Sequence, residues 1–454
     1  MSTTRMEKTP EMLANEAVTE VLKTQWDGEP ALRLDSPPGA GKTWVVERLA
    51  VQAMELHREQ CMISTQTNEQ AFDLARRLAG GFPNLPFHLF AKKGLLLPEV
   101  LTALPNLVVV RSGNDLPVGP SVVISNAAKW SWIKDPPPFD LQIVDEAFQL
   151  PDYRFQQIAG LARRFVLVGD PGQIPPVVTC EIERWKCDRA GPHVACPKAL
   201  VQRHSNVRRL ALPVSRRLVA DTVRFVQPAF YPDLPFTALS GNGTRRLRLT
   251  TPVSGRTAID AALNIAADGA SLCMVELPAK ITGEVDEDVA VAIVGMIGRL
   301  FQRGSTVIED GLTRNLHPSM IGIVCAHVSQ VNAIRERLPV ELSEVFVETS
   351  DRFQGLERQL MFVHHPLSGR ADASAFHLEA GRLCVMMSRH RIACWLVGRE
   401  GIADRLLRYA PSGDRVLGID EDAEFEGWRA HLSILRKLAD ERRLLGIPRP
   451  GVTN

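Results

Sequence analysis

A glycine-bearing turn near the amino terminus combines residue types that can hold phosphate groups. Residues 36–43 read Ser-Pro-Pro-Gly-Ala-Gly-Lys-Thr, with a strand-like apolar run at 31–34 before them and a helical pattern at 43–54 after them. Glycine lets backbone N–H groups turn inward, lysine supplies a point charge, and the threonine hydroxyl is a ligand for Mg²⁺. A strand, such a turn and a helix in succession predict a site for ATP or GTP. Its residues are Pro38, Gly39, Ala40, Gly41, Lys42 and Thr43.

Two adjacent carboxylates end a second apolar run. Residues 141–149 read Leu-Gln-Ile-Val-Asp-Glu-Ala-Phe-Gln, so Asp145 and Glu146 follow directly after a strand. At that place Asp145 can hold Mg²⁺, and Glu146 can orient and deprotonate an attacking water. Adjacent acids also serve as solvated caps at strand ends. Downstream of a phosphate-binding turn, however, the pair predicts hydrolysis of the nucleotide.

The composition shows no global charge bias. The 454 residues are 45% hydrophobic and 23% charged, with a formal net charge of +1, so any surface for nucleic acid must be local. Residues 1–12 lack an apolar signal-peptide core, and no stretch reaches the roughly 20 apolar residues that cross a bilayer. We therefore expect a cytoplasmic protein without a membrane partner. The 8 scattered cysteines are typical of reduced core thiols.

Short apolar runs alternate with helical segments, which is typical of an α/β fold with mostly parallel sheets. One series of expected strands lies near 62–64, 107–110, 122–125, 141–144 and 165–168. A second series lies near 320–325, 345–347, 361–363 and 394–397. The pattern predicts a first domain over 1–205, a second over 206–420 and a C-terminal helical tail over 421–454. Within the first domain we expect a small insertion at 80–120 and an irregular excursion at 171–197.

A third strand runs into a polar turn at 169–176, which reads Gly-Asp-Pro-Gly-Gln-Ile-Pro-Pro. This turn and the Asp-Glu-Ala-Phe-Gln sequence resemble motifs III and II of superfamily 1 helicases. The resemblance is strongest to the branch that contains the eukaryotic RNA-surveillance (nonsense-mediated decay) helicase. It implies two tandem RecA-like P-loop domains with the nucleotide in the interdomain cleft. In that family the glutamine corresponding to Gln173 senses the γ-phosphate.

The remaining motifs of the family follow in the expected order. By resemblance, Arg217 is a γ-phosphate arginine and Arg389, in the motif VI sequence at 382–391, is an arginine finger. Arg216 replaces the usual tyrosine and can still stack on adenine. Asn15 stands where the family has an adenine-reading glutamine. The resemblance thus implies ATP and Mg²⁺ as cofactors.

Residues 349–357 resemble motif V of the family and read Thr-Ser-Asp-Arg-Phe-Gln-Gly-Leu-Glu. By resemblance, Gly355 and Glu357 face the nucleotide. The implied catalytic set is then Lys42, Glu146, Gln173, Arg217 and Arg389.

The family resemblance also implies a track for single-stranded DNA or RNA, contacted mostly at phosphate and sugar. The expected contacts are Thr65, Asn68, Ser125, Gln330 and Thr349. Trp130 and Trp132 either stack on bases or pack internally, with packing preferred. The basic stretch of Arg245, Arg246 and Arg248 either extends the track or is a solvated face.

Three thiols and an imidazole lie within the irregular excursion. Cys180, Cys187, His193 and Cys196 are residue types that bind Zn²⁺ tetrahedrally, but the two leading cysteines lack the short separation of a typical zinc knuckle. We expect a metal-free loop here.

Together these patterns predict an ATP-dependent helicase or translocase on single-stranded nucleic acid. DNA is favoured over RNA, and 5′ to 3′ polarity is implied by the branch that the chain resembles. The alternative is a nucleic-acid-stimulated ATPase that acts as a non-translocating clamp or as a regulatory subunit of a larger complex. Because the chain leaves room for only a small insertion, a protein partner for processive unwinding is also expected. A small-molecule kinase would not need the motif V and VI residues.

Overall fold

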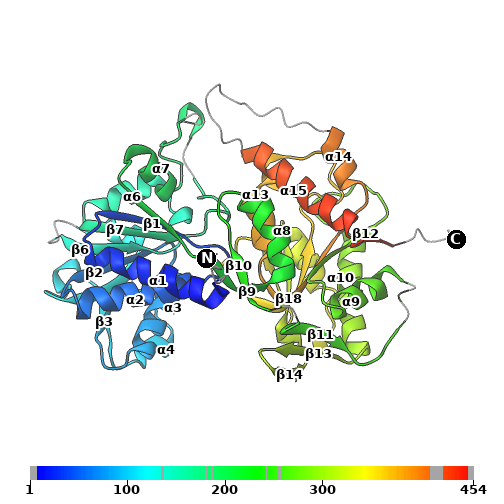
Figure 1. Cartoon of the computed structure of the whole chain (residues 1–454), viewed down its shortest axis with the longest axis horizontal. Helices are drawn as coiled ribbons and strands as arrows, with labels where there is room; N and C mark the ends of the chain where they lie inside the picture. The colour runs from blue at the N-terminus through cyan, green and yellow to red at the C-terminus, as the bar shows by residue number, and fades with distance from the viewer. Residues whose placement is uncertain are drawn as a thin grey trace, which may run out of the picture. The chain divides into compact units, whose positions relative to one another are not determined.

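The computed structural model describes residues 8–133, 138–178, 181–185, 188–241, 243–253, 255, 257–408 and 423–447. The chain forms two compact units (Figure 1). Unit 1 comprises Met1–Pro171 and Pro175–Val214, and unit 2 comprises Gly172–Ile174 and Ser215–Asn454. Each unit is built on a parallel sheet with helices on both faces. The predicted α/β fold class, with two tandem RecA-like domains and mostly parallel sheets, is confirmed.

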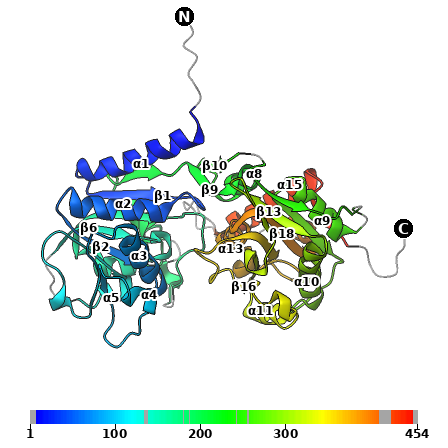
Figure 2. The ribbon, with the colours of Figure 1, turned by 90° about the horizontal axis from the view of Figure 1, so that it is seen from below.

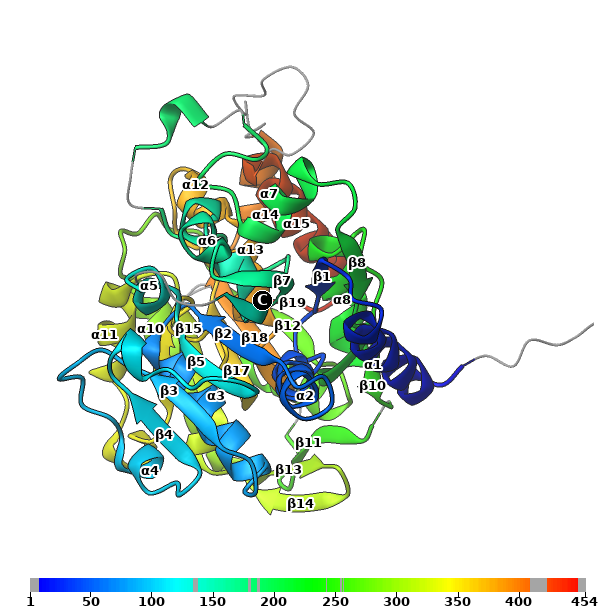
Figure 3. The ribbon, with the colours of Figure 1, turned by 90° about the vertical axis from the view of Figure 1, so that its left-hand side faces the viewer.

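The sheet of unit 1 has eight strands, all paired in parallel, in the order β4-β3-β5-β2-β6-β7-β1-β8. Figure 3 shows most of these strands from the side of unit 1. Their bounds are β1 Ala31–Asp35, β2 Gln60–Thr65, β3 Phe87–Phe90, β4 Leu107–Val110, β5 Ser121–Asn126, β6 Phe139–Val144, β7 Ala162–Gly169 and β8 Arg208–Ala211.

Helices cover both faces of this sheet and bury a separate apolar cluster on each face. On one face pack α1 (Pro10–Trp26), α2 (Lys42–Glu55) and α3 (Asn68–Gly81). On the other pack α5 (Ala127–Trp130), α6 (Asp152–Ala159) and α7 (Cys196–Arg203). Helices α1 and α2 lie side by side (Figure 2), joined by a bond from Gln25 Nε2 to the carbonyl of Leu49 at 3.2 Å. Shorter pieces are α4 (Glu99–Thr102), η1 (Gly113–Asp115), η2 (Ala147–Gln149) and η3 (Glu183–Trp185).

Residues 80–120 do not form the separate small insertion that the sequence predicts. Instead β3 and β4 extend the main sheet at its β5 edge, with α4 between them. Both strands have only four residues, and β4 is an edge strand whose Val108 is exposed. The sequence predicts β4 as the strand near 107–110 but does not predict β3, because a strand of only four residues carries little periodic signal.

The main sheet of unit 2 has six parallel strands in the order β16-β15-β17-β18-β12-β19. Their bounds are β12 Leu272–Leu277, β15 Ile321–Cys325, β16 Phe346–Thr349, β17 Arg358–His364, β18 His390–Arg399 and β19 Leu444–Gly446. One face packs on α9 (Ala258–Ala267), α10 (Glu287–Gln302) and α11 (Val328–Arg335). The other packs on α8 (Ala220–Phe230), α13 (Ala380–Met387), α14 (Ile402–Arg408) and α15 (Ala423–Asp440).

Two small sheets accompany the main sheet of unit 2. Strands β9 (Val214–Val219) and β10 (Thr237–Ser240) form a pair. Strands β11 (Arg245–Leu249), β13 (Ser305–Glu309) and β14 (Leu312–Asn315) form an antiparallel sheet in the order β11-β13-β14. The remaining short helices are α12 (Ala375–Leu378), η4 (Pro318–Met320) and η5 (Val340–Leu342). Among the described residues no helix is both long enough and apolar enough to span a bilayer.

The C-terminal segment differs from the wholly helical tail expected over 421–454. Helix α15 ends at Asp440, and Arg442 then adopts a left-handed conformation with a φ of 56°. The turn delivers β19 to the edge of the main sheet, where it pairs in parallel with β12. The apolar pair Leu444 and Leu445 continues the helical pattern by chance but packs as a strand.

Buried histidines make unit 2 sensitive to acid. Burial lowers the pKa of His364 and His377 to about 4, and that of His390 and His431 to about 3. In the unfolded chain each has a pKa of 6.5. The unfolded state therefore binds more protons below that pH, so stability is full above pH 6.5 and falls as the pH drops toward 4. Each fully buried histidine contributes about 1.4 kcal/mol of this loss per pH unit.

We therefore expect hydrogen exchange in β18 and α15 to show lower protection at about pH 5 than at about pH 7.5, after correction for intrinsic exchange rates. Replacing buried His431 with glutamine should flatten that dependence. The matched control is His317→Gln, because the His317 side chain is exposed. Equal pH dependence in the parent and in His431→Gln would contradict the assignment.

Candidate functional site

The phosphate-binding turn lies between the end of β1 and the start of α2. Gly39 and Gly41 have φ values of 71° and 91°, which glycine adopts without steric cost. Ala40 N donates to the carbonyl of Pro37 at 3.1 Å, and α2 then begins at Lys42. Gly41 has no side chain to cap the first turn of α2, so the helix N–H groups stay available to an anion. The turn therefore fits the phosphates of a nucleotide.

Lys42 reaches the two carboxylates at the end of β6. Its Nζ contacts Glu146 Oε1 and lies 3.8 Å from Asp145 Oδ1. Burial alone lowers the pKa of Lys42, but the nearby Glu146 and Asp145 carboxylates outweigh it and raise that pKa above its usual value. Burial raises the pKa of Asp145, and the Lys42 ammonium opposes that shift. Two segments far apart in sequence thus place one cation and two acids in contact.

The backbone at Glu146 is strained. Its φ is 54°, a left-handed conformation in which a residue with a side chain costs roughly 1–3 kcal/mol. Asp145 Oδ1 accepts a hydrogen bond from Glu146 N at 2.9 Å, and Asp145 N donates to the carbonyl of Ser64 at 2.9 Å. These two bonds stabilise the strained turn. The strain falls on the residue that the sequence predicts as the general base.

Strand β7 brings the third motif to the same edge of the sheet, because it lies between β1 and β6. A Cβ added at Gly169 would lie 2.9 Å from Phe148 Cδ2 and 3.0 Å from Ala147 N, so the two motif turns pack backbone to backbone. The next residue, Asp170, is buried and its carboxylate also raises the pKa of Lys42. Sequence reasoning assigned no role to Asp170, although it stands inside the motif III sequence.

Gln173 belongs to the short segment 172–174 that groups with unit 2 rather than with the first domain. A Cβ added at Gly381, in α13, would lie 2.4 Å from the Gln173 carbonyl oxygen and 2.7 Å from Ile174 N. A Cβ added at Gly172 would lie 2.5 Å from Tyr231 Cζ. The segment is therefore held against α13, the helix that precedes Arg389.

We expect Gly381→Ala to lower ATP turnover about 10- to 100-fold, because the added methyl group must displace the Gln173 backbone. The matched control is Gly295→Ala in α10, where an added Cβ meets no atom within 4 Å among the described residues. Since alanine favours a helix over glycine by about 1 kcal/mol, the control should be as stable as the parent or more so. Thermal unfolding and steady-state hydrolysis measure both effects. Parent-level turnover in Gly381→Ala would contradict the role of this contact.

In unit 2 two arginines share the carboxylate of Glu357. Arg217 Nε donates to Glu357 Oε2 at 2.6 Å, and an Arg391 terminal nitrogen donates to Glu357 Oε1 at 2.8 Å. Burial alone raises the pKa of Glu357, but these two guanidinium groups outweigh it and hold the pKa below its usual value. Arg389 is buried, and its carbonyl accepts from Arg358 N at 2.9 Å. Sequence reasoning missed Arg391, although it is a basic residue of motif VI.

The other predicted nucleotide-binding residues occupy varied places. Asn15 is exposed on α1, and Arg216 is exposed in β9. Thr43 lies in the first turn of α2, and Pro38 is buried in the phosphate-binding turn. Gly355 has a φ of 80°, so the motif V turn requires glycine there. Their roles stay predictions.

Three of the predicted nucleic-acid contacts gather at the carboxyl ends of β2 and β5. Thr65 and Ser125 are buried, and their hydroxyls donate to the carbonyls of Thr67 and Phe90 at 2.9 and 2.5 Å. Asn68 Oδ1 accepts from Asn126 Nδ2 at 2.6 Å. Of these three residues, Asn68 is the most accessible to solvent.

The two predicted contacts of unit 2 are buried. Gln330 Oε1 accepts from Asp286 N at 2.6 Å, and Gln330 Nε2 donates to the Asp286 carbonyl at 3.2 Å. Both ends of this amide therefore stabilise the start of α10. Thr349 ends β16 and its carbonyl accepts from Phe353 N at 3.0 Å. A contact of either side chain with nucleic acid stays a prediction.

The two tryptophans behave differently. Trp130 is fully buried and its Nε1 donates to the Ile63 carbonyl at 3.0 Å, so it packs in the core as preferred. Trp132 is 82% exposed and remains a candidate for base stacking.

Of the cysteine and histidine group, Cys180 and Cys187 lie outside the described residues. Cys196 is buried in α7, with its Sγ donating to the Ala147 carbonyl at 3.4 Å.

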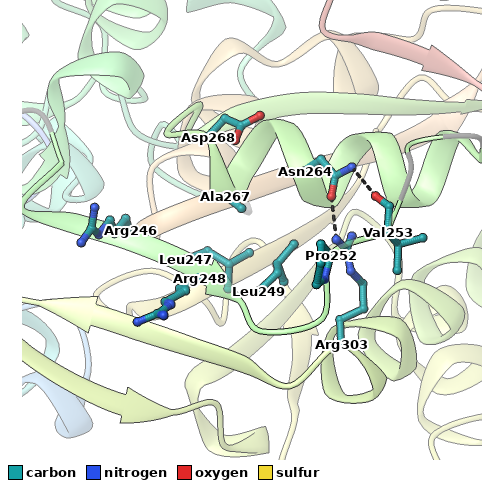
Figure 4. Close-up of a pocket in the computed structure, with 10 residues that line it drawn as sticks. All are labelled: Arg246, Leu247, Arg248, Leu249, Pro252, Val253, Asn264, Ala267, Asp268 and Arg303. Carbon is teal, nitrogen blue, oxygen red and sulfur yellow. Dashed lines mark hydrogen bonds between the residues drawn. The ribbon is translucent and has the colours of Figure 1, made fainter.

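The basic stretch in β11 also divides into two parts. The Arg245 side chain is 6% exposed and donates to main-chain carbonyls of β9. Arg246 and Arg248 are exposed and line a pocket of about 530 Å³ beside α9, opposite Asn264 and Arg303 (Figure 4).

Comparison with protein families finds an AAA domain at residues 282–401. The match covers less than half of the chain and includes the segment that carries Glu357, Arg389 and Arg391. It supports a nucleotide-dependent role for this part of unit 2. No curated protein matches the sequence.

Solved structures of viral helicases show partial similarity to the chain. A PRRSV helicase has 15% sequence identity and a TM-score of 0.43, over 86% of this chain and 55% of that chain. An arterivirus nonstructural protein 10 (helicase) in complex with DNA has 13% identity and a TM-score of 0.44, over 87% of this chain and 66% of that chain. Another structure of arterivirus nonstructural protein 10 (helicase) has 13% identity and a TM-score of 0.43, over 84% and 61% of the two chains. This chain therefore spans less than two thirds of each of these proteins.

Proposed function

We propose that the chain is an ATP-dependent helicase or translocase on single-stranded nucleic acid, with DNA as the preferred track and 5′ to 3′ polarity. The observation that carries the proposal is the convergence of Lys42 with Asp145 and Glu146 beside a phosphate-binding turn. ATP hydrolysis needs a cation for the phosphates and a base for water, and these side chains supply both. The ordered motifs of the sequence supply the link to helicases.

Hydrolysis proceeds, in this proposal, at the carboxyl edge of the unit 1 sheet. Lys42 moves from the carboxylates to the β- and γ-phosphates, and Glu146 then orients the attacking water and takes its proton. Mg²⁺, when bound, would neutralise phosphate charge, and Thr43 and Asp145 are the residues that would hold it. Asn15 and Arg216 would contact the adenine.

Unit 2 contributes the cations that respond to the γ-phosphate. Arg217 and Arg389 stabilise the charge that develops in the transition state, and Gln173 senses the γ-phosphate. Glu357 and Gly355 line the nucleotide. Because only ATP engages these groups fully, hydrolysis changes the relation between the two units and drives movement along the strand.

The first test is ATP hydrolysis at low and moderate salt with no nucleic acid, with single-stranded DNA and with single-stranded RNA. The Glu146→Gln variant is the control for contaminating activity. We expect strong stimulation by DNA that is lost in the control. Stimulation by RNA alone would show that the track is RNA and not DNA. Control-sensitive turnover that responds to neither polymer would contradict the motor.

The second test separates a translocase from a clamp. Strand displacement is measured on duplexes with a 5′ or a 3′ single-stranded tail of equal length. We expect displacement only from the 5′ tail. Stimulated hydrolysis without displacement or directional movement would favour the non-translocating clamp, and supplying candidate protein partners would then test for a processivity factor.

A further inference from the structure

A closed ring of charged contacts in unit 2 links Arg217 to the three-stranded sheet β11-β13-β14. Glu357 binds both Arg217 and Arg391, as described above. Arg391 Nε in turn contacts Glu309 Oε1, at the end of β13. Glu309 Oε1 also lies 3.5 Å from Arg245 Nε in β11. The ring thus alternates in charge from one member to the next.

Arg245 closes the ring on the main chain. A terminal nitrogen of Arg245 donates to the carbonyls of Arg216 and Arg217 at 2.9 and 2.8 Å. Arg245 and Glu309 are directly opposite in the antiparallel pair of β11 and β13, and each side chain is only 6% exposed. Opposite charges at directly opposite positions of an antiparallel pair attract each other, and removing one partner of a buried pair is strongly unfavourable.

We propose that Glu309 and Arg245 are positioning residues for Arg217. The inference rests on the proposed function, in which Arg217 exchanges Glu357 for a phosphate oxygen. When it does so, Arg391 stays on the other carboxylate oxygen, so Glu357, whose side chain is 37% exposed, keeps one cation. Glu309 keeps Arg391 in place for that purpose. Its own side chain is only 6% exposed, and a buried carboxylate without a partner is strongly unfavourable, so the contact with Arg391 is maintained.

Arg245 acts on the backbone in the same exchange. Its two hydrogen bonds hold the carbonyls at 216 and 217 whether or not the Arg217 side chain is paired. The guanidinium of Arg217 can therefore change partner while its Cα stays in place. A sheet that carries no helicase motif thereby controls the geometry of a motif arginine.

The neighbouring arginine on β11 provides a matched control. Arg246 follows Arg245 directly but points to the opposite face of the strand, where it is exposed and lines the pocket of Figure 4. Its side chain makes no hydrogen bond or ion pair that the described part of the chain reveals. Arg246→Gln therefore removes the same charge from the same strand without touching the ring.

The experiment compares steady-state ATP hydrolysis of Glu309→Gln, Arg245→Gln and Arg246→Gln, each in the parent and in an Arg217→Ala background. Glutamine keeps the size of Glu309 and removes its charge. In the parent we expect Glu309→Gln and Arg245→Gln to lower kcat about 10-fold, with KM within about 2-fold, because a small misplacement of a catalytic group costs that much. In the Arg217→Ala background the same changes should cost less than about 2-fold, because they act through Arg217.

The outcomes are distinct. Equal losses in both backgrounds, or losses shared by Arg246→Gln, would overturn the inference, as a merely structural role predicts them. Parent-level kcat in Glu309→Gln would overturn it as well and would leave the proposed function standing. Absence of ATP turnover in the parent would overturn the proposed function and the inference together. Thermal unfolding of each variant checks that the losses of kcat occur in folded protein.

Discussion

Glu146→Gln is expected to lower ATP turnover by about 10²- to 10⁴-fold, the range that a positioned general base contributes. Glutamine preserves the size of the side chain but cannot accept the proton of water. The change also removes one of the carboxylates that contact Lys42. The ammonium is then freer to meet phosphate, so nucleotide affinity should be unchanged or higher.

Steady-state hydrolysis and the binding of a fluorescent ATP analogue measure these two effects separately. The control is Glu55→Gln, because Glu55 is exposed at the end of α2 and leaves the turn intact. A Glu146→Gln variant that binds nucleotide and hydrolyses it at the parent rate would show that another group activates water. Asp170 is the carboxylate to replace next, since it is buried and also acts on Lys42.

Arg389→Lys is expected to lower kcat by about 10³- to 10⁵-fold, the range associated with an arginine finger. Lysine keeps the positive charge but loses the planar fork that binds two phosphate oxygens at once. Because the loss concerns the transition state, KM for ATP should change little.

Arg389 is buried, so its replacement also needs a measurement of folding. Thermal unfolding and the far-ultraviolet circular dichroism spectrum should show a folded variant. Arg408→Lys is the control, since Arg408 is exposed at the end of α14. A rise in KM with kcat unchanged would assign Arg389 to ground-state binding instead.

Long strands with strong apolar runs were predictable from the sequence. The expected strands near 122–125 and 320–325 correspond to β5 and β15. Both strands are buried on two faces and rich in valine and isoleucine, which gives them a strong apolar signal. Strand β11 was not predictable. It reads Arg-Arg-Leu-Arg-Leu, and its polar residues carry the pattern of a charged surface segment.

The core of the candidate site was predictable for a different reason. Lys42, Asp145 and Glu146 each stand at the end of a strand, and parallel strands bring their carboxyl ends to one edge. Contacts that depend on register were not predictable. Glu309 in β13 contacts Arg391 in β18, although the two strands belong to different sheets. No spacing in the sequence predicts that these two sheets come together at these residues.

The placement of β1 within its sheet has a consequence for folding during synthesis on the ribosome. Strand β1 ends at Asp35, but both of its neighbours, β7 and β8, come much later, and β8 ends at Ala211. At typical rates of synthesis the P-loop strand must therefore wait roughly 10 to 30 s for its partners. Strands β2 to β6 can pair earlier, as a nascent sheet whose β6 edge is still open. During this interval the newly made chain carries an unpaired strand edge, and exposed edges of this kind are prone to aggregation.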